Sequence, residues 1–170
     1  MSESTKAVLA FQPDWQALLH NYLLRRQNEA FKWGTMDCCL FACDAILELT
    51  GVDLAADFRG KYDSVRSAVK VMREFVTTEA GDMHLVEAVA QKIAWDFDIV
   101  EVPVLMAQRG DVLLLNSPLD KSLGLLGLRG THVHCAGTDG VVEVPLAECL
   151  RAWRIPKFAP VPPEATIQAR

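Results

Sequence analysis

The residues with the clearest chemical potential are an adjacent cysteine pair, Cys38-Cys39, and two histidines, His132 and His134. A cysteine hydrolase pairs a thiolate nucleophile with a base, commonly an imidazole. His132 and His134 are two residues apart in the apolar segment THVHCA, so in a strand both side chains point to the same face. Cys38 with His134 or His132 as its base is therefore the candidate catalytic pair.

The cysteine pair opens a predicted helix. Asp37 is a residue type that caps helices, and Gly51 is a stop signal. Between them, apolar residues recur at helical spacing, at Phe41, Ala42, Ala45, Ile46 and Leu49. Free backbone N–H groups and the positive end of the helix dipole favour a thiolate at such a start. The pattern therefore predicts Cys38 in the first turn of a half-buried helix.

The segment around Cys38 resembles a known family. W-G-x-x-D-C-x-x-F, formed by Trp33, Gly34, Asp37, Cys38 and Phe41, is similar to the nucleophile segment of NlpC-type cysteine peptidases. These are papain-like enzymes that cut cell-wall peptides. The Ser-Gly that commonly follows their cysteine is replaced here by Cys-Leu.

Two further segments resemble a divergent NlpC-like branch found in phage and prophage tail proteins. They are Phe58–Tyr62, FRGKY, and Ala152–Ile155, AWRI. The resemblance implies phage tail proteins or a peptidoglycan peptide as partners. It also implies a location in the host bacterial cytoplasm during assembly and then in the virion tail.

The resemblance leaves two functions open. One is a thiol peptidase or amidase acting on peptidoglycan stem peptides, with Cys38 as nucleophile and His134 or His132 as base. In the family pattern, however, the base opens the second strand, and Ser122 stands at that position. Serine is no general base near neutral pH. The alternative is a catalytically degenerate domain with a structural or assembly role in the tail.

Other interpretations of these residues need no catalysis. Cys38 could be a small core residue, and Cys39 and Cys43 are expected in the core. The two histidines could be polar residues on a half-exposed strand, and His84 a solvent-facing residue at a helix start. A zinc site made by His132, His134 and Cys38 or Cys43 lacks a supporting C-x-x-C pair, so we expect no metal and no cofactor.

Composition narrows the class of protein. The chain has 170 residues, 51% of them hydrophobic and 23% charged, which is typical of one soluble globular domain. With a net charge of −5 and no dense basic run, we expect no nucleic-acid binding. No apolar run reaches the ~20 residues that span a bilayer, and the N-terminus lacks signal-peptide features. The five cysteines, three of them in one helix, favour a reducing compartment.

The order of periodicities predicts the fold class. Helical spacing dominates up to about Ala94, and short apolar strands follow from about Asp98. The expected helices run from Pro13 to near Phe31, from Cys38 to Gly51, from Ser64 to Phe75 and from Met83 to Ala94. This order predicts an α+β domain of papain-like NlpC type, with N-terminal helices followed by a small antiparallel sheet. We expect residues 1–156 to form that single domain and the Pro-rich residues 157–170 to form a mobile tail.

Overall fold

The computed structural model describes residues 8–76, 83–118 and 120–160. Four α-helices come first in these residues: α1 (Trp15–Arg26), α2 (Cys38–Thr50), α3 (Val65–Val76) and α4 (Leu85–Asp96). Six strands follow: β1 (Val100–Val102), β2 (Val112–Ser117), β3 (Asp120–Leu126), β4 (His132–Ala136), β5 (Val141–Pro145) and β6 (Arg151–Arg154). Short 3-10 helices span Val104–Met106 and Leu146–Glu148. The predicted α+β class, helices before strands, is confirmed.

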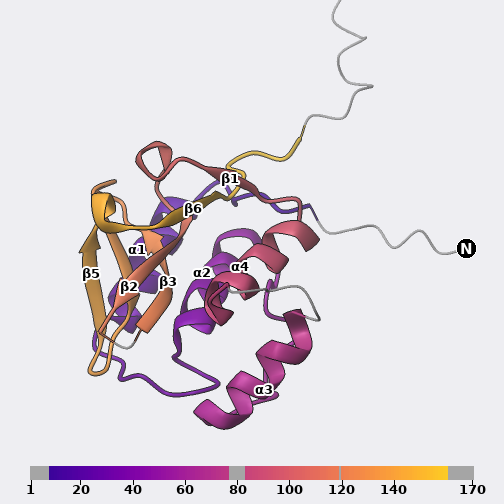
Figure 1. The fold of residues 1–170 in the computed structure, drawn as a ribbon. Coiled ribbons are helices and arrows are strands. Elements are labelled where there is room, and N and C mark those ends of the chain that lie inside the picture. The colour runs from indigo at the N-terminus through magenta and orange to yellow at the C-terminus, as the bar shows by residue number, and fades with distance from the viewer. Residues whose placement is uncertain (1–7, 77–82, 119, 161–170) are drawn as a thin grey trace, which may run out of the picture.

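The strands form one sheet in the order β1-β6-β2-β3-β4-β5, and every pairing between them is antiparallel. Helix α2 packs against β3 and β4, and α4 packs against β3. Figure 1 shows the sheet on one side and α2, α4 and α3 gathered on the other. The predicted meeting of the cysteine helix with an antiparallel sheet is therefore confirmed.

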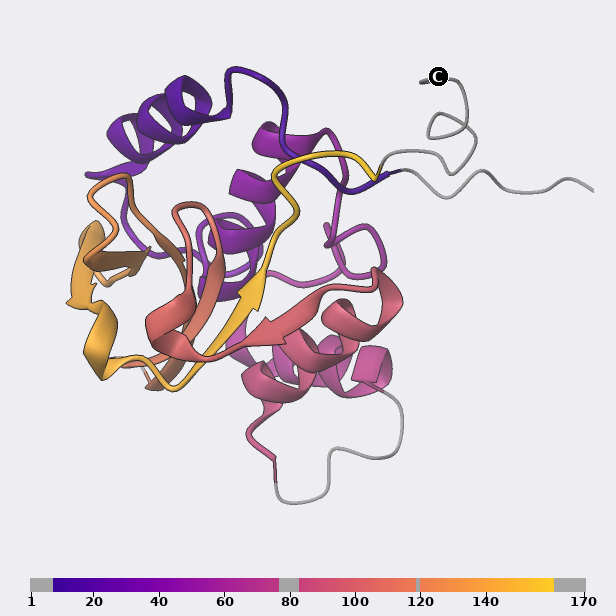
Figure 2. The same cartoon turned by 90° about the horizontal axis from the view of Figure 1, so that it is seen from above.

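The helices α1 and α3 lie on different sides of α2. Helix α1 contacts α2, and α3 contacts α4. Figure 2, which looks at the molecule from above, shows α1 apart from the α3–α4 pair, with α2 between them. This arrangement creates two separate surface regions, one beside α1 and one beside α3 and α4.

The first helix is shorter than predicted, since α1 ends at Arg26 and not near Phe31. The chain leaves the helix to reach the sheet: Phe31 N donates to Thr138 O, in the turn between β4 and β5, at 3.1 Å. Val141 N donates to Gln27 O at 3.0 Å. These tertiary hydrogen bonds replace the continuation of the helix.

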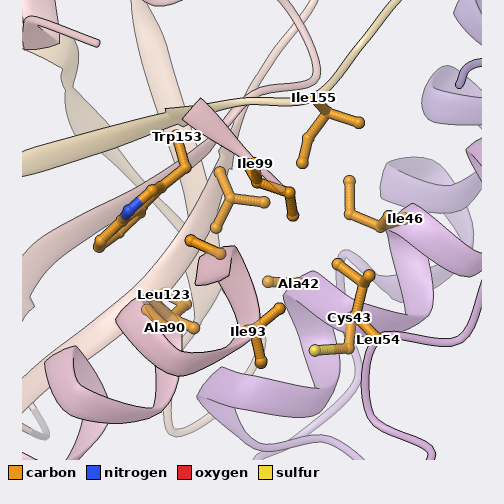
Figure 3. A pocket seen from close by; sticks show the side chains of 12 residues that line it. Ala42, Cys43, Ile46, Leu54, Ala90, Ile93, Ile99, Leu123, Trp153 and Ile155 are labelled. Carbon is orange, nitrogen blue, oxygen red and sulfur yellow. The ribbon is translucent and has the colours of Figure 1, made fainter. Parts of the chain in front are cut away.

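The core between α2, α4 and the sheet contains a small apolar cavity of about 30 Å³. Figure 3 shows Cys43 and Ile46 of α2, Ile93 of α4 and Trp153 of β6 around it. Cys39 and Cys43 are each 3% exposed, so the prediction that both lie in the core is confirmed.

Two further sequence predictions concern the chain ends and membranes. Lys157, the first residue of the expected tail, donates through Nζ to Asp111 at 2.9 Å, and residues 161–170 lie outside the described part. None of the helices in the described ranges has the length and apolar character that a bilayer crossing requires.

Candidate functional site

Cys38 is the first residue of α2, as the sequence predicted, and its side chain is half-buried. The preceding Asp37 is the N-cap: its Oδ1 accepts from the backbone N–H groups of Cys39 and Leu40 at 3.1 and 3.0 Å. Gly51 ends the helix in the left-handed conformation with φ 78°. Both predicted boundaries of the cysteine helix are therefore confirmed.

The second oxygen of Asp37 joins the loop before α2 to the loop before α3. Its Oδ2 accepts from Gly34 N at 2.9 Å and from Tyr62 Oη at 2.8 Å. Gly34 has φ +82°, and a Cβ there would overlap the carbonyl oxygen of Tyr62. With four hydrogen bonds accepted, the buried Asp37 carboxylate holds the backbone around Cys38 in place and is not free to orient a base.

Cys38 lies in a pocket of about 620 Å³ bounded by α2, α3, α4 and the start of β3. Most of its wall is apolar and includes Phe31, Trp33, Val69, Met72, Leu85 and Val86. Polar residues also line it: Arg73, His84, Asp120, Lys121 and Ser122. The volume is in the range of small-molecule sites, which are about 300–1,000 Å³.

Cys39 lies next to Cys38 and also lines the pocket. The neighbouring Cys38 side chain and burial raise the pKa of the Cys39 thiol well above its ordinary value. Burial likewise raises the pKa of Cys43. Cys39 therefore keeps its proton near neutral pH and is not a second nucleophile.

His132 and His134 line a different pocket, of about 550 Å³, together with His20 of α1 and Glu143 of β5. His134 Nδ1 lies 3.6 Å from Glu143 Oε1. Burial lowers the pKa of His134 more than the neighbouring Glu143 raises it, so the ring is neutral near pH 7. Among the described residues, no hydrogen bond joins either histidine to Cys38. Their role as its base stays a prediction.

His84 is the histidine that lines the Cys38 pocket, and sequence reasoning placed it at a solvent-facing helix start. Its side chain is 31% exposed and both ring nitrogens are engaged. Nδ1 accepts from Val86 N at 3.3 Å, and Nε2 lies 2.9 Å from Asp120 Oδ2. No sequence signal links His84 to Asp120, because the pair forms only through the packing of α4 on the sheet.

Ser122 also lines the Cys38 pocket and is 2% exposed. Its Oγ lies 2.8 Å from Ser117 Oγ on the neighbouring strand. The position at which the family pattern has its histidine thus faces the same pocket as Cys38, but it carries a hydroxyl group.

The candidate zinc ligands, His132, His134 and Cys38 or Cys43, do not form a cluster in the described ranges. The one group there of three or more His, Cys, Asp or Glu donors within 4.8 Å of one another is Asp37, Cys38 and Cys39. Asp37 already accepts four hydrogen bonds, so its carboxylate fits the role of a helix cap and not that of a metal ligand.

Comparisons with known proteins give a family and a likeness to solved structures. A search of curated proteins finds no match. The fold is similar to the crystal structure of the NlpC/p60 domain of the peptidoglycan hydrolase SagA, with a TM-score of 0.47 and 17% identity over 82% of this chain and 97% of that chain. A family model matches residues 12–155. The chain therefore belongs to the family described as a domain of unknown function, DUF6950.

Proposed function

We propose that this protein is a catalytically degenerate NlpC-like domain with a structural or assembly role in a phage or prophage tail. The observation that carries the proposal is the histidine arrangement. All four histidines of the chain lie in the described residues, and three of them line the other pocket. The fourth, His84, has both ring nitrogens engaged.

The chemistry of peptide hydrolysis explains why the arrangement of the histidines matters. An acid must protonate the leaving amine, and a base must then activate a water molecule; an imidazole beside the thiol serves in both roles. The Cys38 pocket offers the hydroxyl of Ser122 and the carboxylate of Asp120, which already pairs with His84. A thiol without an available imidazole is a poor hydrolase of amides.

The two segments that resemble those of tail proteins make contacts that stabilise the fold. Tyr62 holds Asp37, and Arg59 forms ion pairs with Asp44 and Asp53. Trp153 is 2% exposed in the core. A tail role predicts that the protein is found in purified tail particles by mass spectrometry, and that Cys38→Ala leaves its incorporation unchanged.

The proposed loss of catalysis is tested by restoring histidine, the family residue, at the position of Ser122. Wild-type protein is expected not to hydrolyse a synthetic peptidoglycan stem peptide, while Ser122→His gains hydrolysis that Cys38→Ala removes in the double variant. Ser122→Asn is the control, because it adds bulk in the same buried position without a base. Hydrolysis by the wild type that Cys38→Ala abolishes would overturn the proposal.

A second candidate is an active thiol peptidase or amidase on stem peptides. It is favoured by the placement of Cys38, half-buried at a capped helix start and open to a pocket. In this case His134→Ala or His132→Ala is expected to lower kcat about 10²- to 10⁴-fold, the usual contribution of a general base. His20→Ala is the matched control, because His20 lines the same pocket as both histidines. Equal activity in all three variants would exclude this candidate.

A further inference from the structure

Most of the wall of the Cys38 pocket is apolar, although Arg73, Asp120 and Lys121 also line it. Val65, Ala68, Val69 and Met72 face it from α3, and Leu85, Val86 and Val89 face it from α4. We propose that the pocket accepts a linear acyl chain, and that Cys38 takes the acyl group from an acyl thioester. This inference goes beyond the proposed function and does not depend on binding of a peptide.

The apolar side chains of the pocket come from several elements. Two adjacent helices, α3 and α4, supply aliphatic side chains, and Phe31 and Trp33 add a T-shaped pair of rings with centroids 4.9 Å apart. Val65 is 57% exposed, so this apolar surface contacts water when the pocket is empty. Covering it with methylene groups is favourable by the hydrophobic effect.

The position of the Cys38 thiol determines where the carbonyl end of the acyl chain must lie. Cys38 lines the same pocket at the start of α2, at the positive end of the helix dipole. An acyl chain between α3 and α4 therefore brings its carbonyl carbon to the Cys38 thiol.

The reaction needs no imidazole, which fits the absence of a free one beside Cys38 in the described residues. The Cys38 thiolate attacks the thioester carbonyl, a new carbon–sulfur bond forms at Sγ, and the carbon–sulfur bond to the carrier breaks. The carrier leaves as a thiolate and takes the proton that Cys38 released. Unlike an amine, a thiolate of ordinary pKa, about 8.5, departs without prior protonation.

The proposal is tested by acylating the full-length protein with acetyl-, octanoyl- and myristoyl-coenzyme A below their micellar concentrations. Peptide mapping is expected to find a hydroxylamine-labile adduct on Cys38. Rates are divided by those of glutathione with the same donors, which removes differences in intrinsic reactivity. One buried methylene corresponds to a preference of about fourfold. The octanoyl donor is therefore expected to exceed the acetyl donor by at least about tenfold.

A matched pair of variants separates the pocket from general reactivity. Val69→Phe places a ring in the pocket and should reduce octanoylation at least tenfold, whereas Val100→Phe, at a position 65% exposed on β1, should leave it unchanged. A further test uses only the wild type and so does not depend on how the variants fold. Free octanoate should slow alkylation of Cys38 by iodoacetamide.

Three results would overturn the proposal. They are no adduct on Cys38, a normalised rate that does not depend on chain length, and no protection by octanoate. Failure of the stem-peptide or tail experiments leaves these outcomes unaffected, because the adduct is read directly by mass.

Discussion

At the scale of single residues, Cys38 differs from the other four cysteines in its access to solvent. It is half-buried and lines a pocket, while the other four are buried. Burial raises the pKa of Cys135 to about 12 and that of Cys149 to about 11. Relative to an ordinary thiol, with pKa about 8.5, their thiolate populations near neutral pH fall by roughly two orders of magnitude or more.

Cys38 is therefore expected to be the first cysteine that iodoacetamide modifies near neutral pH. Brief alkylation of the native protein followed by mass-spectrometric mapping measures this order. Because raised pKa values keep the buried thiols protonated, Cys135 and Cys149 should gain reactivity only as the pH approaches 11 to 12. Earlier labelling of Cys149 than of Cys38 would contradict the assignment of Cys38 as the accessible thiol.

Tyr62 supports the same site by donating to the buried Asp37 carboxylate. Tyr62→Phe is expected to lower the free energy of unfolding by about 1.5–3 kcal/mol, the range for hydrogen bonds to charged groups. Tyr22→Phe is the matched control, because Tyr22 Oη donates to a neutral acceptor, Phe41 O, at 2.6 Å. Its loss should cost about 0.5–1.5 kcal/mol. Urea denaturation measures both, and equal losses would argue against a special role of the Asp37 contact.

At the scale of elements, α2 is held to its neighbours by an ion-pair network. Asp44 of α2 contacts Arg26 of α1 at 2.9 Å and Arg59 of the following loop at 2.7 Å. Arg59 also binds Asp53 at 2.8 Å. The network fixes the loop that leads from α2 to Tyr62, and so it indirectly positions the start of α2.

This network predicts a dependence of stability on pH. The hydrogen bond from Arg59 lowers the pKa of Asp53 below its ordinary value. A lowered folded-state pKa contributes stability above the unfolded pKa, about 3.9, and this stability is lost as the pH falls through the folded-state value. Asp53→Asn should therefore lose less stability on acidification from pH 6 to pH 3 than the wild type.

Thermal unfolding at several pH values measures this difference. Asp57→Asn, an exposed residue in the same loop, is the control and should follow the wild type. A parallel acid response in the wild type and Asp53→Asn would show that the Asp53 pair does not contribute.

At the scale of the whole molecule, Asp111 connects the end of the chain to the sheet. It is fully buried, and its carboxylate accepts from Arg154 Nε at 2.8 Å and from Lys157 Nζ at 2.9 Å. It also accepts from the backbone N–H groups of Gln108 and Ile155 at 2.7 and 3.1 Å. One side chain thus holds the turn before β2, the end of β6 and the first tail residue.

Asp111→Ala is expected to lower the free energy of unfolding by about 3–5 kcal/mol, because it removes a fully buried carboxylate and leaves two partly buried cations without their counter-charge. Glu101→Ala is the control. It removes a more exposed partner of Arg151 and should cost less than about 1 kcal/mol. Urea denaturation compares the two, and similar losses would mean that the Asp111 cluster adds no special stability.

The sequence by itself determined the local elements and the fold class. The Asp37 cap, the apolar spacing of α2 and the Gly51 stop are short-range signals, because they depend on residues within a few positions of one another. The change from helical to alternating periodicity predicted helices before an antiparallel sheet, and the structure has that order. The core positions of Cys39 and Cys43 followed from the same helical spacing.

Only the tertiary structure decided which of these elements share a pocket. His132 and His134 lie on one face of β4, as their spacing predicted, but they line a pocket beside α1, while the Cys38 pocket is lined by α3 and α4. The pairing of His84 with Asp120 joins residues far apart in the sequence through the packing of α4 on β3. Spacing along one strand defines a face, whereas the partner across that face depends on how the helices pack.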